Sequence, residues 1–170
     1  GLDDTNFTCY TPLYCGITDI PASYATGRLQ KFSWDSAFWV FNFVSNYAGL
    51  RYEPMIADVR AVQRAIEGHY LAVQPAFEQA AVTLHRTDPV LAARWLTDYS
   101  VLQAEEVVRR WRTLGEQLLA KYNDGYIQDD KGRPQETGYP EGWLREVVRR
   151  HPEKLKLPVG AGAAAEPKDY

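Results

Sequence analysis

Two cysteines, Cys9 and Cys15, are the candidate nucleophiles of this chain. A thiol attacks a carbonyl as its thiolate, which requires a nearby base or a positive environment. The histidines, His69, His85 and His151, lie in or beside helical patterns, and none has an acid at a spacing typical of a catalytic triad. We therefore interpret the cysteines as buried structural thiols, with a catalytic cysteine as the alternative, and predict no catalytic residue in this chain.

The acidic residues and histidines do not indicate a metal site. Asp129 and Asp130 begin a polar stretch that lacks the remaining ligand positions of a calcium loop, and no short cluster has the spacing of a zinc site. Glu105 and Glu106 are adjacent in a helical pattern, so their carboxylates point in different directions and are poorly placed for general acid–base catalysis. The sequence predicts no metal and no cofactor.

A third candidate site is Trp34-Asp35-Ser36, in the aromatic run from Lys31 to Tyr47. In a functional interpretation, Trp34 and Asp35 bind substrate and Asp35 holds an amine. In a structural interpretation, Ser33 or Asp35 caps a helix that starts at Ser36, a carboxylate suits the positive end of that helix, and Trp34 fills the core. Capping alone explains the residue types, so the structural interpretation is preferred, and Trp34 and Asp35 remain the substrate-binding candidates.

These segments also resemble a known family, the cysteine-type dipeptidases related to the secernins, in its C-terminal part. The resemblance is carried by Asp4-Thr-Asn-Phe-Thr-Cys-Tyr-Thr-Pro-Leu-Tyr-Cys-Gly-Ile-Thr-Asp-Ile-Pro21 and Phe32-Ser-Trp-Asp-Ser-Ala-Phe-Trp-Val-Phe-Asn-Phe-Val-Ser-Asn46. It continues more weakly through Arg51-Tyr52 and Asp58-Val59 to the region of Gly115-Glu116, about two thirds of the chain. The Trp34-Asp35-Ser36 neighbourhood is its most specific part.

The resemblance implies an N-terminal nucleophile hydrolase with an αββα core. In that family the catalytic cysteine is the first residue of the mature chain, where the free α-amine can act as its base. This chain begins with Gly1, so we expect it to be the C-terminal segment of a dipeptidase whose nucleophile lies outside the chain. The implied partners are the upstream part of the same polypeptide and a dipeptide substrate.

Composition excludes some other classes of function. The chain has 170 residues, 45% hydrophobic and 13% aromatic, which is enough for a sizeable core. Its formal net charge of −3, without a basic stripe, argues against a nucleic-acid partner. The longest apolar run is interrupted by Asn42, Ser45 and Asn46, so no segment reaches the roughly 18–20 residues that span a bilayer. For the cellular location, the sequence leaves two alternatives, a cytoplasmic or an exported protein.

The candidate residues must be positioned by a mixed set of elements. Residues 7–17 are rich in Thr, Tyr, Cys and Ile and predict one or two strands, which would need a sheet that this chain does not contain. An apolar helix over 36–47 is expected to be buried. Spacings of three and four over 54–121 predict a helical hairpin, with Asp88 as a cap, Pro89 in the first turn and a kink at Pro75.

A short helix over 140–150 follows, and residues 159–170 read as a flexible tail after a domain of 1–158. The predicted fold class is α+β, mostly α in this chain, as the C-terminal portion of an αββα hydrolase. We expect the hairpin to form a homo-oligomer. The alternative function is a helical protein-interaction or oligomerisation module without catalytic activity, in which Trp95, Tyr99 and Trp111 form the recruiting face.

Overall fold

The computed structural model describes residues 7–137 and 141–155. These residues are mostly helical, with one small two-stranded antiparallel sheet. The chain divides into two compact units, residues 1–121 and 122–170, whereas the sequence predicts one domain over 1–158. The predicted tail, 159–170, lies outside the described residues.

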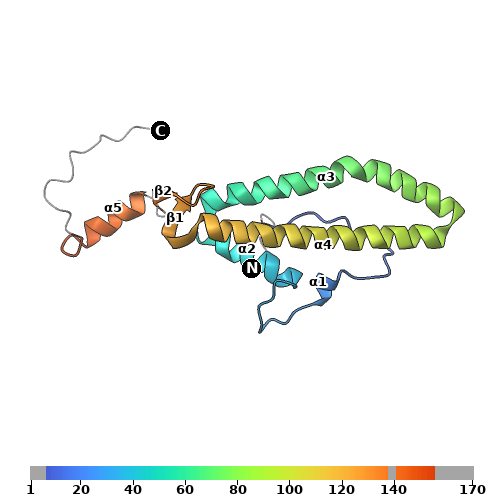
Figure 1. The fold of residues 1–170 in the computed structure, drawn as a ribbon, viewed down its shortest axis with the longest axis horizontal. Coiled ribbons are helices and arrows are strands. Elements are labelled where there is room, and N and C mark those ends of the chain that lie inside the picture. Colours follow the sequence, from blue (N-terminus) through green and yellow to red (C-terminus); the bar gives the residue numbers. More distant parts are fainter. Residues whose placement is uncertain (1–6, 138–140, 156–170) are drawn as a thin grey trace. The chain divides into compact units, whose positions relative to one another are not determined.

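Two long helices, α3 (Tyr52–Thr87) and α4 (Pro89–Lys121), form the body of the first unit and pack side by side (Figure 1). Their buried side chains recur at helical spacing, so each helix turns one apolar stripe toward the other elements. The largest apolar side chains that are fully buried in these stripes are Val59, Ile66, Val107, Trp111, Leu114 and Leu118. α3 continues through Pro75 as one bowed helix. It is not broken there, although proline has no backbone N–H to donate to the preceding turn.

A single residue, Asp88, joins the two helices. Its backbone N–H donates to Leu84 O at 2.8 Å, which closes the last turn of α3. Its carboxylate accepts the backbone N–H of Leu91 at 2.9 Å and so caps the first turn of α4, which begins at Pro89. Asp88 has the extended backbone typical of a cap, with φ −147° and ψ 91°.

Replacing Asp88 by alanine is expected to lower the free energy of unfolding by about 1 kcal/mol, since one N-terminal donor of α4 loses its acceptor. Urea denaturation followed by circular dichroism measures the change. Asp98→Ala is the matched control: this exposed carboxylate on α4 has a 3.9 Å contact with Arg94, and its loss should cost under about 0.5 kcal/mol. Equal effects of both substitutions would contradict the capping role.

Helix α2 (Ala37–Gly49) packs against α4 and α3 through one face only. Val40, Val44 and Ala48 on that face are fully buried. Gly115 allows the close approach of α4, because a Cβ there would lie 3.1 Å from Phe43 Cδ1. Within this chain, the helix that the sequence predicts as buried is therefore covered on one face. Ser36 takes the N-cap position without a side-chain capping bond, so the predicted capping is wrong.

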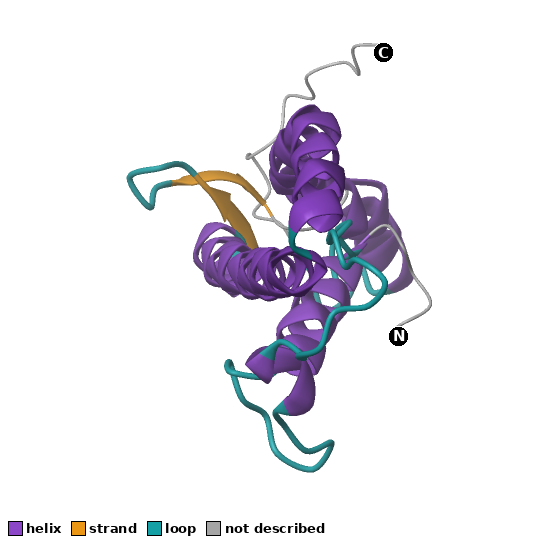
Figure 2. Cartoon of the chain, turned by 90° about the vertical axis from the view of Figure 1, so that its right-hand side faces the viewer, coloured by secondary structure: helices purple, strands orange, loops and turns teal. Residues whose placement is uncertain are grey.

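Residues 7–17 form no strand, which corrects the predicted sheet segment. Residues 8–21, which we call the strap, instead run as a loop against α3 and α4 (Figure 2). The short helix α1 (Ala22–Ala25) begins at the end of the strap.

Polar side chains of the two helices satisfy the backbone of the strap. The bonds are Gln63 Nε2 to Thr8 O (2.8 Å), Tyr10 N to Glu67 Oε1 (2.9 Å), Tyr14 N to Ser100 Oγ (3.3 Å) and Thr18 N to Thr97 Oγ1 (3.2 Å). In α1, which follows the strap, Ser23 N donates to Glu105 Oε1 at 2.9 Å. Backbone groups need partners, but those partners need not belong to a second strand. The one or two strands predicted over residues 7–17 are therefore a loop whose backbone is satisfied by side chains of the two helices.

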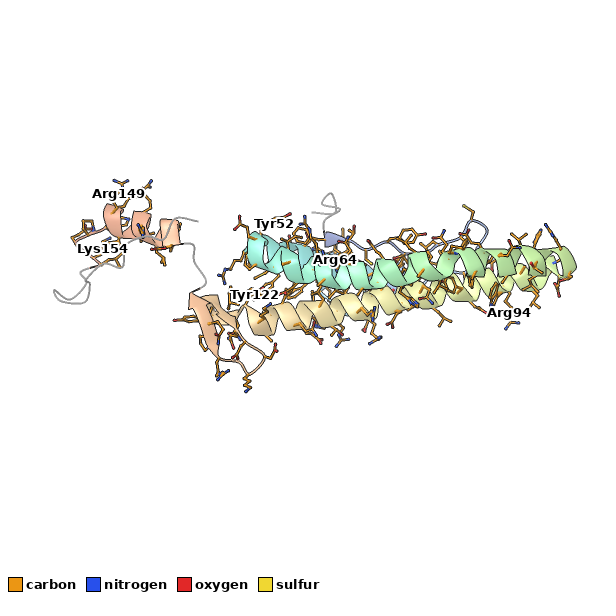
Figure 3. All side chains as sticks on the ribbon, turned by 90° about the horizontal axis from the view of Figure 1, so that it is seen from above. Tyr52, Arg64, Arg94, Tyr122, Arg149 and Lys154 are labelled. Atoms are coloured by element: carbon orange, nitrogen blue, oxygen red, sulfur yellow. The ribbon has the colours of Figure 1, made fainter. Side chains whose placement is uncertain are left out.

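The second unit contains a short 3-10 helix, η2 (Asn123–Gly125), the strands β1 (Tyr126–Gln128) and β2 (Pro134–Thr137), and helix α5 (Glu141–Arg150). β1 and β2 pair antiparallel across a turn that the sequence predicts only as polar loop. Asp129 holds this turn by accepting the backbone N–H groups of Lys131 and Arg133 at 2.9 and 3.0 Å. On α5, Arg149, labelled in Figure 3, donates two hydrogen bonds of 2.7 Å to the carboxylate of Glu146.

Candidate functional site

The two predicted substrate-binding residues occupy different environments. Trp34 is half-buried, with ring centroids 4.9 Å from Phe32 and 5.1 Å from Phe43. The guanidinium carbon of Arg112 lies 5.7 Å from the centre of the Trp34 ring, which is a cation–π contact. Asp35 is exposed, and its backbone N–H donates to Ser33 Oγ at 3.2 Å. The structure thus makes Trp34 part of an aromatic cluster and leaves the Asp35 carboxylate at the surface.

Beside this cluster, the second face of α2 carries an open groove of about 340 Å³. We call it the aromatic groove. It is lined by Phe32, Trp39, Asn42, Phe43, Asn46, Tyr47 and Leu50. Trp39 is fixed by its indole N–H, which donates to Arg28 O at 2.9 Å. Trp34 contacts the groove through Phe32 and Phe43, whereas Asp35 is not among the lining residues.

The lining of the aromatic groove suits binding and not proton transfer. Its one phenol, Tyr47, has a pKa raised by burial, so the hydroxyl stays protonated at neutral pH. Asn46 Nδ2 donates to Asn42 Oδ1 at 3.1 Å, and neither amide ionises. The groove can therefore hold a ligand by apolar contact and hydrogen bonding, while a nucleophile and a base would have to come from elsewhere.

The cysteines lie away from any catalytic arrangement. Cys9, a residue of the strap, is half-buried, and burial followed by the Glu67 charge raises its pKa to about 12, against a smaller opposing effect of Arg110. Its thiol points to Tyr10 O at 3.5 Å. Cys15 is exposed, and both cysteines are free. A thiol with so high a pKa is almost wholly protonated at neutral pH, so Cys9 is a poor nucleophile.

We expect iodoacetamide to modify Cys15 at least tenfold faster than Cys9 at pH 8, because the thiolate is the reacting form and Cys9 is both protonated and half-buried. Peptide mass spectrometry of timed samples gives the two rates. In urea, which unfolds the protein and exposes both thiols, the two alkylation rates should become similar. This control shows that the difference comes from the folded structure. Faster alkylation of Cys9 in the folded protein would contradict the raised pKa and reopen its role as a nucleophile.

Three other features were considered as functional sites: metal ligands, a membrane-spanning helix and the aromatic face predicted to bind a partner. Within residues 7–137 and 141–155, no three metal-ligating side chains lie together, and no helix is long and apolar enough to cross a membrane. The recruiting face assigned to Trp95, Tyr99 and Trp111 is contradicted at Trp111. Trp111 is fully buried, 5.4 Å from the ring centre of Phe41, and Trp95 and Tyr99 stack on Phe77 at 4.2 and 3.8 Å.

The aromatic groove itself was missed from the sequence, although its signal was present. Trp39, Asn42, Phe43, Asn46 and Tyr47 recur at spacings of three and one, which places them on one side of a helix. The apolar residues on the other side hid this pattern, because the helix then looked buried all round.

Comparison with known proteins gives one finding. Residues 1–65 match the model of Peptidase family C69. No curated protein and no solved structure matches the chain significantly. The matched range contains the strap, α1, α2 and the first turns of α3, and with them Trp34, Asp35 and every residue that lines the aromatic groove. The resemblance read from the sequence is confirmed over this range, and it associates the N-terminal part of the chain with a peptidase.

Proposed function

We propose that the chain is the C-terminal segment of a cysteine-type dipeptidase with an αββα N-terminal nucleophile hydrolase fold. The observation that carries the proposal is the match of residues 1–65 to Peptidase family C69. The state of the chain's own thiols is consistent with a nucleophile outside it, since the pKa of Cys9 is raised to about 12 and Cys15 is exposed without a described partner base.

In this proposal the reaction and the binding belong to different parts of the polypeptide. The α-amine of an N-terminal cysteine takes the proton of its thiol, and the thiolate attacks the peptide carbonyl. The C–N bond breaks, the leaving amine takes up that proton, and water then hydrolyses the acyl-enzyme and frees the cysteine. The present chain supplies substrate contacts. Asp35, exposed beside the aromatic cluster of Trp34, is the group suited to hold the ammonium of a dipeptide.

The test compares this chain with the longer polypeptide encoded by the same reading frame. The chain alone should not release amino acids from a panel of dipeptides, whereas the longer polypeptide should, and replacing its N-terminal cysteine by alanine should abolish the reaction. Hydrolysis by the chain alone that is lost on Cys15→Ala would overturn the proposal. A longer polypeptide without a cysteine at its mature N-terminus would also overturn it.

Within the active polypeptide, Asp35→Asn is expected to raise KM for dipeptides about tenfold and to leave kcat within twofold, because the charge contacts the bound amine and not the scissile bond. Initial rates over a range of dipeptide concentrations give both constants. N-acetylated dipeptides, which lack the ammonium, should show no difference between the two enzymes. Asp98→Asn, an exposed carboxylate on α4, is the control. A fall in kcat alone would contradict a binding role.

A further inference from the structure

The second half of the strap is exposed between two fixed ends. Pro12 is buried and Pro21 is fully buried, so the chain is anchored at both positions. Between them lie residues 13–20, which we call the flap. Most flap residues are exposed, and the apolar side chains of Leu13 and Ile20 are 45% and 67% exposed. The flap therefore adds little apolar burial to the first unit.

The hydrogen bonds from the backbone of the flap to α4 are long. The Tyr14 N–H donates to Ser100 Oγ at 3.3 Å, and the Thr18 N–H donates to Thr97 Oγ1 at 3.2 Å. The two bonds that hold the start of the strap are shorter, at 2.8 and 2.9 Å. Since hydrogen bonds of this kind usually measure about 2.7–3.2 Å, those of the flap lie at the weak end of the range.

Tyr14 is the side chain that pins the flap to both helices. Its ring centre lies 5.8 Å from that of Phe77 on α3 and 6.3 Å from that of Tyr99 on α4. These two rings stack on each other at 3.8 Å and so form one surface beneath Tyr14. The Tyr14 hydroxyl donates to Glu78 Oε1 at 3.4 Å, again a long bond. One half-buried ring thus bridges the gap between the two helices.

The polar partners of the flap have further hydrogen bonds within their own helices. Thr97 Oγ1 donates to Ala93 O at 2.8 Å, and Glu78 Oε1 accepts Gln74 Nε2 at 2.7 Å. Neither bond involves the flap. Thr97 and Ser100 are 5% and 0% exposed, but their hydroxyls can bond to water in place of a peptide N–H. Removing the flap would therefore leave no group of α4 dependent on it for a partner.

We propose that the flap opens as a unit between Pro12 and Pro21 while α3 and α4 stay folded, and that its opening uncovers the surface formed by Phe77 and Tyr99. The freed backbone regains conformational entropy, which offsets the loss of long hydrogen bonds. Exposed segments with few apolar contacts are the parts of proteins that open locally. The flap controls access to the surface between the two helices, and this role is independent of the proposed peptidase activity.

Hydrogen exchange of the complete 170-residue chain, followed by NMR at each amide, tests the opening. The Tyr14 and Thr18 amides should exchange about tenfold more slowly than in an unfolded peptide, because each is bonded in the closed flap. They should still exchange about 100-fold faster than the Trp111 amide inside α4. Low concentrations of urea should accelerate exchange at Trp111 and hardly change it at the flap, since opening the flap exposes little surface.

Tyr14→Ala removes the pin and should lower the protection of the Thr18 amide about fivefold, while the protection of the Trp111 amide stays unchanged. Ile20→Ala is the matched control. It truncates an apolar side chain of the same flap that is 67% exposed, and it should change the protection of the Thr18 amide by less than about twofold.

Three results would overturn the proposal. If the flap amides exchange at the rate and with the urea dependence of Trp111, the flap opens only when the helices unfold. If they exchange as fast as in an unfolded peptide, the flap is not closed in solution. If Tyr14→Ala lowers the protection of Trp111 as much as that of Thr18, the flap and α4 open together.

Discussion

Replacing Trp111 by alanine is expected to lower the free energy of unfolding of the first unit, which we call the helical unit, by about 3–5 kcal/mol. The indole is fully buried between α4 and α2, where its ring centre lies 5.4 Å from that of Phe41. Its removal leaves a cavity that the surrounding helices cannot fill without moving. Urea denaturation followed by circular dichroism at 222 nm gives the change.

Trp111→Phe is the companion substitution. The indole Nε1 has no hydrogen-bond partner among the described residues. Phenylalanine would therefore reduce the buried volume without breaking a hydrogen bond. It should therefore cost less than half as much as alanine. Trp143→Ala, which removes a 52% exposed indole from α5, should change the stability of the helical unit by under about 0.5 kcal/mol. A loss below 1 kcal/mol for Trp111→Ala would mean that α2 does not pack on α4 as described.

The second large effect is expected at Gly27. Its φ of +115° is unfavourable for any residue with a Cβ, and a Cβ there would lie 2.4 Å from Ser36 Oγ and 2.7 Å from Ser36 Cβ. Gly27→Ala should therefore destabilise the protein by about 2–5 kcal/mol, the sum of backbone strain and overpacking. Thermal and urea unfolding report the loss.

Gly16→Ala separates the two contributions. Gly16 also has a positive φ, +89°, but nothing lies within 4 Å of a Cβ at that position. Alanine there should cost only the strain, about 1–2 kcal/mol. If both substitutions lowered the free energy of unfolding equally, the close contact between residue 27 and Ser36 would not explain why glycine is needed at position 27.

The long helices were predictable because their evidence is local. Spacings of three and four define the stripes of α3 and α4, and Asp88 followed by Pro89 marks the junction in both sequence and structure. The strap was not predictable in the same way. Residues such as Thr8, Tyr10 and Tyr14 indicate extended chain, but their partners, Gln63 and Ser100 among them, lie on helices far along the sequence.

The same limit applies to the site. Trp34 was singled out from its neighbourhood, and the structure places it against the aromatic groove, but Asn42 and Asn46 were read only as interruptions of an apolar run. Periodicity shows which residues share a face of α2, yet which face α4 covers depends on Gly115 and Trp111, more than sixty residues later. The pair of strands at 126–137 escaped notice because β1 has only three residues.

The single-residue junction between α3 and α4 constrains how this part of the chain can change in length. One extra residue beside Asp88 would turn α4 by about 100° and advance it by about 1.5 Å. Trp111 and Leu118 would then point away from α2 and α3, and the side chains that hold the strap would lose their register. Natural variants should therefore insert or delete residues in the loop before α2 or around β1 and β2, and leave the helix junction at a constant length.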